Sequence, residues 1–524
     1  MPGGLRQFTQ LLVGELLIGT CLVDCFCQEV FGTPVSSQIL SNILLSDARE
    51  QSEFLSSFIG FRLLLKWRIS ALLAIALLYP CSVIGVFHQE WLHIGYISRK
   101  LRLGFLLLCF VYELPSMGRY AELFISPRNQ QRLEDLIIQH YDKAVPTPLH
   151  RLVFACYAQW QSHVFLHDIK HSTLAAAVDS CSYSSPRIVL IIGESYNKHH
   201  SSLYGYPLFT TPLQQDRQKA GEMYVFNDVV TPWNITSNVM LDVFSVWEYG
   251  MSEYIGAMPL VPYLFRQAGY SVNFFSNQYL LNGINSGVFN QMGHFFLSDI
   301  ELSDSLFNYR NKKSRRYDLE LVADYAELKS QEQSPYTLDI IHLVGQHFDY
   351  SKRYPHTEAK FHINDYADRH LSDEEKEIVM HYDNAIYYND IVLDSLLSLN
   401  EQSDAVVLFI SDHGEEVYDE LSLHGRQFQK PTAAQARQEF EVPMWIWCSD
   451  SYRCNHPETI SLISESVNKP FMTDGIPQIL LSLAGISCKW SADESNLLSR
   501  HYQCKPRLIC GTADYDELLS NAKR

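Results

Sequence analysis

The chain has 524 residues, more than one hydrophobic core usually holds, so its length predicts two or three structural units. It carries 41 Lys and Arg residues against 59 Asp and Glu residues, a formal net charge of −18. Residues 1–113 contain eight of each sign, so the whole negative excess lies in the rest of the chain. An acidic globular region of this kind argues against nucleic acid as a partner, because a polyanion would be repelled.

The N-terminal region has the composition of a membrane anchor. Residues 69–87 form an uncharged run of 19 positions, which as a helix could cross a hydrocarbon core of about 30 Å. Residues 11–23 and 103–112 are weaker apolar runs, and each could instead be a core helix or an interfacial segment. The run after Arg6 could also be a signal peptide, but no small-residue cleavage site follows it cleanly, so we favour an anchor.

Basic residues between these runs set the expected orientation. Arg99, Lys100 and Arg102 precede the third run and favour a cytoplasmic loop. Three spans would then leave everything after about residue 114 on the outer side of the membrane. We therefore predict a helical membrane domain of about three spans over residues 1–113, a connector over 114–185 and a globular domain over 186–524.

The globular region alternates strand-like and helix-like segments. Runs rich in β-branched and aromatic residues predict strands at 187–193, 270–275, 337–344, 404–410 and 442–447. Helical patterns lie between them at 260–269 and 374–399. Such alternation is typical of an α/β fold in which helices cover both faces of a mostly parallel sheet.

Chemically active side chains follow several of these strands. Glu194 comes directly after the first, His347 after the third, and Asp412 and His413 after the fourth, with His424 eleven residues after His413. In open α/β folds the carboxyl ends of the strands form the ligand-binding edge of the sheet. Two carboxylates and an imidazole suit a zinc-type site with an open position for a substrate oxygen. The alternative is a polar turn that binds nothing.

A candidate nucleophile precedes another predicted helix. Thr236 and Ser237 lie just before a helix that we expect to begin near Asn238. Free backbone N–H groups and the helix dipole at such a position favour a phosphate group. The alternative is that one of these hydroxyls merely caps the helix.

The order of the motifs resembles a known family. Residues 192–207, which read Ile-Gly-Glu-Ser-Tyr-Asn-Lys-His-His-Ser-Ser-Leu-Tyr-Gly-Tyr-Pro, are similar to the opening signature of the bacterial phosphoethanolamine transferases. These enzymes are inner-membrane members of the alkaline phosphatase/sulfatase superfamily. The similarity continues at residues 211–212, 267–270, 276–278, 342–347, 353–355, 382–384, 411–415, 423–425 and 441–443, and upstream at 45–55. It is closer to the members that modify the lipopolysaccharide core than to those that modify lipid A.

The resemblance implies a fold and a metal site. The fold would be the sulfatase-like α/β sandwich attached to a helical membrane domain. Glu194, Asp412 and His413 would be zinc ligands, and Thr236 would be the nucleophile, with its oxygen also in contact with the metal. One zinc ion is expected, a second is an alternative, and manganese is less favoured.

The same resemblance implies the partners. Phosphatidylethanolamine would be the donor, lipopolysaccharide the acceptor, and a phosphoethanolamine ester of Thr236 the intermediate. His347 and His424 would line the pocket, where they would hold phosphate or a second metal ion, or transfer a proton. The enzyme would be a multi-pass protein of the bacterial inner membrane with its catalytic domain in the periplasm.

The chain departs from the family pattern at two points, the first of which argues against modification of lipid A, and other functions stay open. The lipid A-modifying members flank their nucleophile with a disulfide pair, where this chain has Pro232 and Asp242, and the family usually has five membrane helices. The alternatives are a glycerol-phosphate transferase with a threonine nucleophile, a phosphodiesterase- or sulfatase-type hydrolase of the same superfamily, and a membrane-anchored sensor with a vestigial site. The surroundings of Thr236 do not match the nucleophile motif of a sulfatase enzyme.

Several residues have no assigned chemistry. We expect surface or packing roles for His199, His200, His342 and His356. Asp47, Glu50 and Glu53 are candidates for the lipid-facing side of the site. The pairs Cys448–Cys454 and Cys504–Cys510 are either local disulfide bridges in an oxidising compartment or free thiols.

Overall fold

The computed structural model describes residues 3–31, 35, 66–84, 111, 148–278, 299–426, 431–511 and 513–522. The chain divides into two compact units, residues 1–165 and 166–524. Nearly all of the predicted third apolar run, at 103–112, lies outside the described residues, as do Asp47, Glu50 and Glu53.

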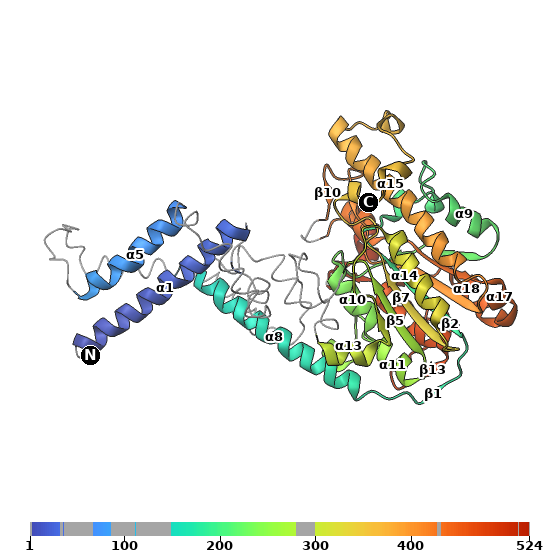
Figure 1. The fold of residues 1–524 in the computed structure, drawn as a ribbon, viewed down its shortest axis with the longest axis horizontal. Coiled ribbons are helices and arrows are strands. Elements are labelled where there is room, and N and C mark those ends of the chain that lie inside the picture. Colours follow the sequence, from blue (N-terminus) through green and yellow to red (C-terminus); the bar gives the residue numbers. More distant parts are fainter. Residues whose placement is uncertain are drawn as a thin grey trace. The chain divides into compact units, whose positions relative to one another are not determined.

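Two apolar helices, α1 (Gly3–Phe31) and α5 (Trp67–Ile84), pack against each other in the N-terminal unit (Figure 1). The hydroxyl of Tyr79 in α5 donates a hydrogen bond to the backbone oxygen of Gln10 in α1 (2.8 Å). This contact joins segments nearly 70 residues apart, so the two apolar runs pack along each other as a helix pair.

The first of these helices is the better candidate for a membrane span. Among the described residues, one helix is long and apolar enough to cross a membrane, at Gln7–Glu29, with a mean hydropathy of 1.7. The run at 69–87 is helical through Ile84, the last residue described there, and the apolar part of this helix is Trp67–Cys81. Residues 85–87 of that run lie outside the described residues, so a span over 69–87 stays a prediction.

Helix α8 (Pro148–Leu174) leads into the second unit. Near its end, Lys170 forms ion pairs with Asp299 (3.0 Å) and Glu301 (2.7 Å). The hydroxyl of Ser172 donates to the backbone oxygen of Gly256 (3.0 Å). These contacts make the last turns of α8 part of the globular unit.

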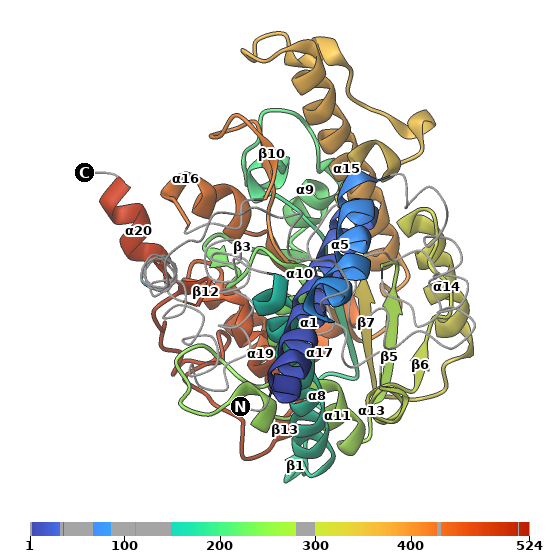
Figure 2. The ribbon, with the colours of Figure 1, turned by 90° about the vertical axis from the view of Figure 1, so that its left-hand side faces the viewer.

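The second unit is built on a seven-stranded sheet with the strand order β3-β11-β8-β2-β7-β5-β6. The strands are β2 (Arg187–Gly193), β3 (Met223–Phe226), β5 (Ser271–Ser276), β6 (Tyr309–Arg310), β7 (Thr337–His342), β8 (Ala405–Ser411) and β11 (Met444–Cys448). β8, β2, β7, β5 and β6 are parallel, whereas β11 runs antiparallel to both β8 and β3. Figure 2 shows β7, β5 and β6 in this order toward one edge. The predicted mostly parallel α/β sheet is confirmed, with all five predicted strands present.

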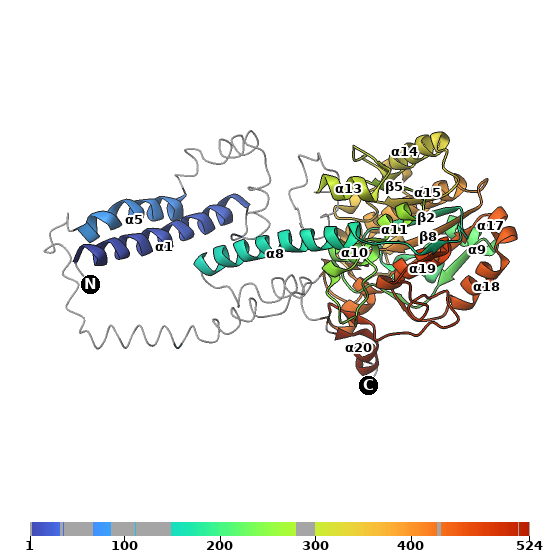
Figure 3. The same cartoon turned by 90° about the horizontal axis from the view of Figure 1, so that it is seen from below.

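Helices cover both faces of this sheet (Figure 3). On one face, α14 (Asp318–Gln331) and α15 (Asp373–Ser398) enclose an apolar cluster with strand residues such as Val189 and Ile191. On the other face lie α10 (Thr236–Phe244), α11 (Val261–Gln267) and α19 (Ile476–Ala484). Because side chains of a strand alternate between two covered faces, β2 is buried from its second residue to its last. That burial explains the continuous apolar run in the sequence.

The cysteines in the described part of the chain are all free thiols. Cys448 is buried at the end of β11, whereas Cys454 is exposed in α17 (Asp450–Asn455). Cys510 is buried and Cys504 is exposed. The alternative of local disulfide bridges was therefore wrong. Each pair has one buried and one exposed thiol, so closeness in the sequence did not bring the two sulfur atoms together.

Candidate active site

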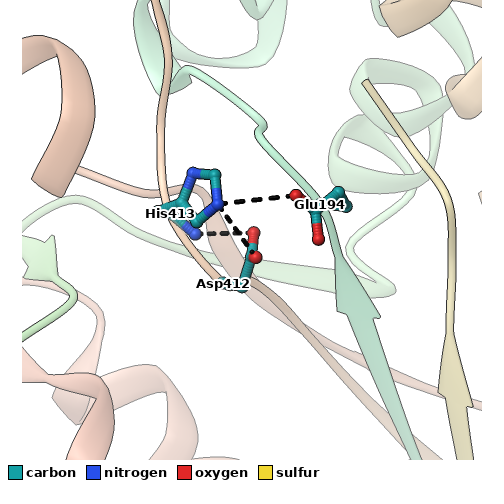
Figure 4. A group of neighbouring side chains, drawn as sticks. All are labelled: Glu194, Asp412 and His413. Carbon is teal, nitrogen blue, oxygen red and sulfur yellow. Dashed lines mark hydrogen bonds and ion pairs between the residues drawn. The ribbon is translucent and has the colours of Figure 1, made fainter. Parts of the chain in front are cut away.

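The carboxyl ends of β2 and β8 meet at one edge of the sheet. Gly193, the last residue of β2, pairs with Ser411, the last residue of β8. The backbone N–H of Asp412 donates to the oxygen of Gly193 (3.1 Å), which extends the ladder by one step. Glu194 and Asp412 therefore emerge side by side, and their side chains converge with that of His413 in a fully buried group (Figure 4).

A fourth donor atom, the hydroxyl oxygen of Thr236, completes this group. Thr236 Oγ1 lies 3.2 Å from Glu194 Oε1 and 3.3 Å from His413 Nε2. His413 Nε2 in turn lies 3.4 Å from Glu194 Oε1 and 3.2 Å from Asp412 Oδ2. Ligand atoms bound about 2.0–2.2 Å from a tetrahedral zinc ion are about 3.3–3.6 Å apart. The observed separations therefore fit the ligand shell of one ion.

Hydrogen bonds outside the group decide which atoms face its centre. His413 Nδ1 donates to the backbone oxygen of Gly414 (2.7 Å), which leaves the lone pair of Nε2 for a ligand. Asp412 Oδ1 accepts from the backbone N–H groups of Ser195 (2.9 Å) and His413 (2.7 Å). Its other oxygen, Oδ2, is buried and has no hydrogen-bond donor among the described residues. Such an oxygen is costly to bury, and a cation would satisfy it, so these residues fit a zinc ion.

The two buried carboxylates have opposite pKa shifts. Burial and the charge of Glu194 raise the pKa of Asp412 to about 7. Burial alone would also raise the pKa of Glu194, but the neighbouring His342 and His413, when protonated, hold it well below its usual range. Two carboxylates in one site have different pKa values because the ionisation of one makes the ionisation of the other less favourable. A bound dication would offset the repulsion and favour ionisation of both groups.

Thr236 is the first residue of α10, so the helix begins two residues earlier than expected. Ile235 occupies the cap position, and the hydroxyl of Thr236 donates to Glu194 instead of to the helix backbone. The alternative in which Thr236 only caps the helix was therefore wrong. Its position at the N-terminus of a helix remains one that favours phosphate.

The two predicted pocket histidines both contact Phe348, one through its backbone and one through its ring. His347 Nδ1 donates to the backbone oxygen of Phe348 (2.7 Å). His424, in β10 (His424–Gly425), stacks on the ring of Phe348 with 5.9 Å between centroids, and its Nδ1 lies 3.0 Å from the hydroxyl of Tyr418. In the described part of the chain, neither histidine forms a hydrogen bond or ion pair with the four donor atoms, and the charge of a protonated His347 would act on Glu194 only from a distance. Their catalytic roles therefore stay predictions.

Three residues near the donor group had no predicted role. Gln278 Nε2 donates to Glu194 Oε2 (2.7 Å); it follows the end of β5, so the strand-end argument could have included it. His342, expected to be a packing or surface residue, is fully buried with its Nε2 3.9 Å from Glu194 Oε2. Arg426 Nη1 donates to His413 Nε2 (2.7 Å). It lies after β10 in an irregular segment, where no sequence pattern indicates chemistry.

Comparison with protein families gives a clear match for this unit. The family described as Sulfatase matches residues 186–486, more than half of the chain. The chain belongs to the sulfatase family. The match begins just before β2 and includes all four donor residues, and it confirms the superfamily to which the motif order pointed.

Known relatives agree with this assignment. Phosphoethanolamine transferase EptC of Escherichia coli strain K12 is 26% identical over 486 residues, which cover 91% of this chain and 80% of EptC. The zinc complex of the C-terminal periplasmic domain of E. coli EptC superposes with a TM-score of 0.56 at 26% identity, over 66% of this chain and 97% of that domain. The integral membrane protein EptA from Neisseria meningitidis, a lipooligosaccharide phosphoethanolamine transferase, shares the fold over 95% of this chain and 87% of its own (TM-score 0.54, 19% identity).

Proposed function

We propose that this chain is a zinc-dependent phosphoethanolamine transferase that moves phosphoethanolamine from phosphatidylethanolamine to lipopolysaccharide. The observation that carries the proposal is the spacing of the donor atoms of Glu194, Thr236, Asp412 and His413 along the edges of a tetrahedral shell. A hydroxyl within a metal shell suits a nucleophile. The names of the relatives and a related domain with bound zinc support the same assignment.

Thr236 would carry the transferred group. Its hydroxyl already directs its proton toward the buried carboxylate of Glu194. One zinc ion held by Glu194, Asp412 and His413 would supply positive charge that makes a threonine alkoxide accessible near neutral pH. Oγ1 attacks the phosphorus of phosphatidylethanolamine, the bond to the diacylglycerol oxygen breaks, and that oxygen takes up a proton. The protein then holds a phosphoethanolamine ester of Thr236.

The second step reverses the first with a different oxygen. A sugar hydroxyl or phosphate oxygen of lipopolysaccharide attacks the same phosphorus, loses its proton if it carries one, and releases Thr236. His347 and His424 are the two candidates for the proton transfers, as acid in the first step and base in the second. Both contact Phe348, His347 through its backbone oxygen and His424 through its exposed ring, which supports a role for the pair in one region of the pocket.

A lipid donor explains a membrane anchor. We propose that residues 1–113 hold the enzyme in the bacterial inner membrane as a multi-pass domain, that residues 114–185 connect it, and that residues 186–524 catalyse the reaction in the periplasm. Helix α1, with its apolar segment Gln7–Glu29, supports this arrangement.

The test is the mass of the intact protein after exposure to donor. The full-length chain, loaded with zinc in detergent micelles, is mixed with phosphatidylethanolamine and analysed by mass spectrometry. The wild type should gain one phosphoethanolamine group that maps to Thr236. Thr236→Ala should gain none while it keeps its zinc, because three ligands remain. Thr236→Ser should react partially, since a primary hydroxyl can still attack.

Other results of this experiment would favour one of the alternative functions or another nucleophile. An adduct on Ser195 or Ser237 would overturn the role of Thr236 but leave the transferase standing. Release of free phosphoethanolamine without transfer to lipopolysaccharide would indicate a hydrolase. An adduct formed from phosphatidylglycerol in preference to phosphatidylethanolamine would indicate a glycerol-phosphate transferase.

A further inference from the structure

Arg426 presents its guanidinium to the nitrogen of His413 that faces the proposed metal. Its Nη1 donates to His413 Nε2 (2.7 Å) and to the backbone oxygen of Asn234 (3.0 Å), and its Nε lies 3.7 Å from Glu415 Oε2. About one fifth of the side chain is exposed. The reaction described above assigns this arginine no role, although it touches the centre of the site.

The contact means that two groups compete for one lone pair. Because His413 Nδ1 donates to the oxygen of Gly414, Nε2 offers a single lone pair. An N–H group of Arg426 and a metal ion cannot both use it. When the ion binds, Arg426 must leave Nε2, and it can keep its bond to Asn234 while its other donors turn toward the rest of the site.

Those donors lie within reach of the reacting oxygen. Thr236 Oγ1 is 3.3 Å and Arg426 Nη1 is 2.7 Å from the same atom, His413 Nε2. The two atoms are therefore no more than about 6 Å apart, roughly twice the length of a hydrogen bond. The guanidinium is therefore within reach of an oxygen of a phosphoryl group on Thr236, and a planar guanidinium is the side chain best suited to bind such an oxygen.

We propose that Arg426 is a further catalytic residue, which binds an oxygen of the transferred phosphoryl group once a metal ion has displaced its guanidinium from His413. The phosphoryl part of this inference rests on the proposed function, whereas the exchange on His413 needs only the metal site. Arg426 would thus donate a hydrogen bond to His413 in the metal-free protein and to the phosphoryl group in the metal-bound protein.

The test measures two affinities with opposite expected changes. Zinc binding to the metal-free full-length chain in detergent is measured by competition with a chromophoric chelator, and binding of inorganic phosphate to the zinc-loaded chain by calorimetry. Arg426→Met should bind zinc about three- to tenfold more tightly, because the competing hydrogen bond is gone. It should bind phosphate at least about tenfold more weakly, because a charge-assisted bond is lost.

Two further variants complete the design. Arg426→Gln keeps a polar group near Asn234 and should show the same two signs if the methionine variant does not fold. Arg437→Met removes an arginine that pairs with Glu420 outside the donor group, and it should change neither affinity.

The directions of the changes in zinc and phosphate affinity distinguish the possible roles of Arg426. If both affinities fall together, Arg426 only maintains the structure of the site, and the proposal is wrong. If phosphate affinity is unchanged, the phosphoryl role is wrong whatever happens to zinc. Formation of the phosphoethanolamine adduct by the wild type is measured separately. If zinc affinity rises and phosphate affinity falls as expected but no adduct forms, the proposed transferase function is wrong and the role of Arg426 stands.

Discussion

The charge of Asp412 should make the metal-free protein less stable as the pH rises. Its pKa is about 7 in the folded chain against an ordinary value of 3.8, because it is buried and faces Glu194. The folded state therefore holds the proton more tightly than the unfolded state does. Stability from this group is complete below about pH 4, is lost between about pH 4 and 7, and stays lost above that range. The whole effect is at most about 4 kcal/mol.

Asparagine at this position keeps the shape and removes the charge. Its oxygen can still accept from the backbone N–H groups of Ser195 and His413, and its amide group would face His413 Nε2, which lies 3.2 Å from the present Oδ2. Metal-free Asp412→Asn should therefore be more stable than metal-free wild type by up to about 4 kcal/mol at pH 8 and nearly equal to it at pH 4. Zinc should stabilise the wild type and not the variant.

The assay is urea unfolding of the full-length chain in mild detergent with a chelator present, followed by tryptophan fluorescence from pH 4 to pH 8. Asp474→Asn is a matched control, because burial and Glu248 raise the pKa of Asp474 to about 7 outside the donor group. It should show the same pH-dependent gain in stability and bind zinc normally. A gain for Asp412→Asn that does not change with pH would refute the reasoning, since packing and not charge would then be its cause.

The remaining predictions concern support for the site. Gln278→Ala removes the hydrogen bond to Glu194 Oε2 and should weaken zinc binding about tenfold in chelator competition, with the unfolding midpoint little changed. His200→Asn should lower the free energy of unfolding by about 3–5 kcal/mol in urea, because the buried ring lies 2.6 Å from Asp383 Oδ1 and its loss leaves that buried carboxylate with hydroxyl partners only, whereas Asp419 keeps its ion pair with Arg369. An unchanged zinc affinity in Gln278→Ala would contradict the role of Gln278, and an unchanged unfolding midpoint in His200→Asn would contradict the role of His200.

The strands that carry the site could be predicted because burial on both faces leaves a continuous apolar run. β2 and β8 have such runs, and the polar residues directly after them had to reach the same edge of a parallel sheet. β3 and β6 were missed because four and two residues at the edges of the sheet carry too little periodic signal. The antiparallel direction of β11 was not predictable either, since direction depends on the path of the chain between strands and not on the strand itself.

The supporting residues of the site were harder to predict for a different reason. His342 lies at the end of β7 and looked like any buried strand residue, because its distance from Glu194 depends on the register between β7 and β2. Arg426 depends on the turn between β9 (Glu416–Val417) and β10, which brings it back toward His413. Sequence spacing fixes neither of these relations, so the grouping of Glu194, Asp412 and His413 could be predicted, whereas the positions of His342 and Arg426 could not.

The balance of charge around Thr236 constrains the order in which the site can be filled. Glu194 and Asp412, when ionised, carry two negative charges, which a dication would balance. The phosphodiester of the donor and the alkoxide of Thr236 would add two more. The N-terminus of α10 supplies about half a positive charge and the guanidinium of Arg426 supplies one, so both are needed beside the ion. In the metal-free site that guanidinium is held by His413 and the carboxylates repel anions. The metal must therefore bind first, and the release of Arg426 would make the site attractive to phosphate only after it has.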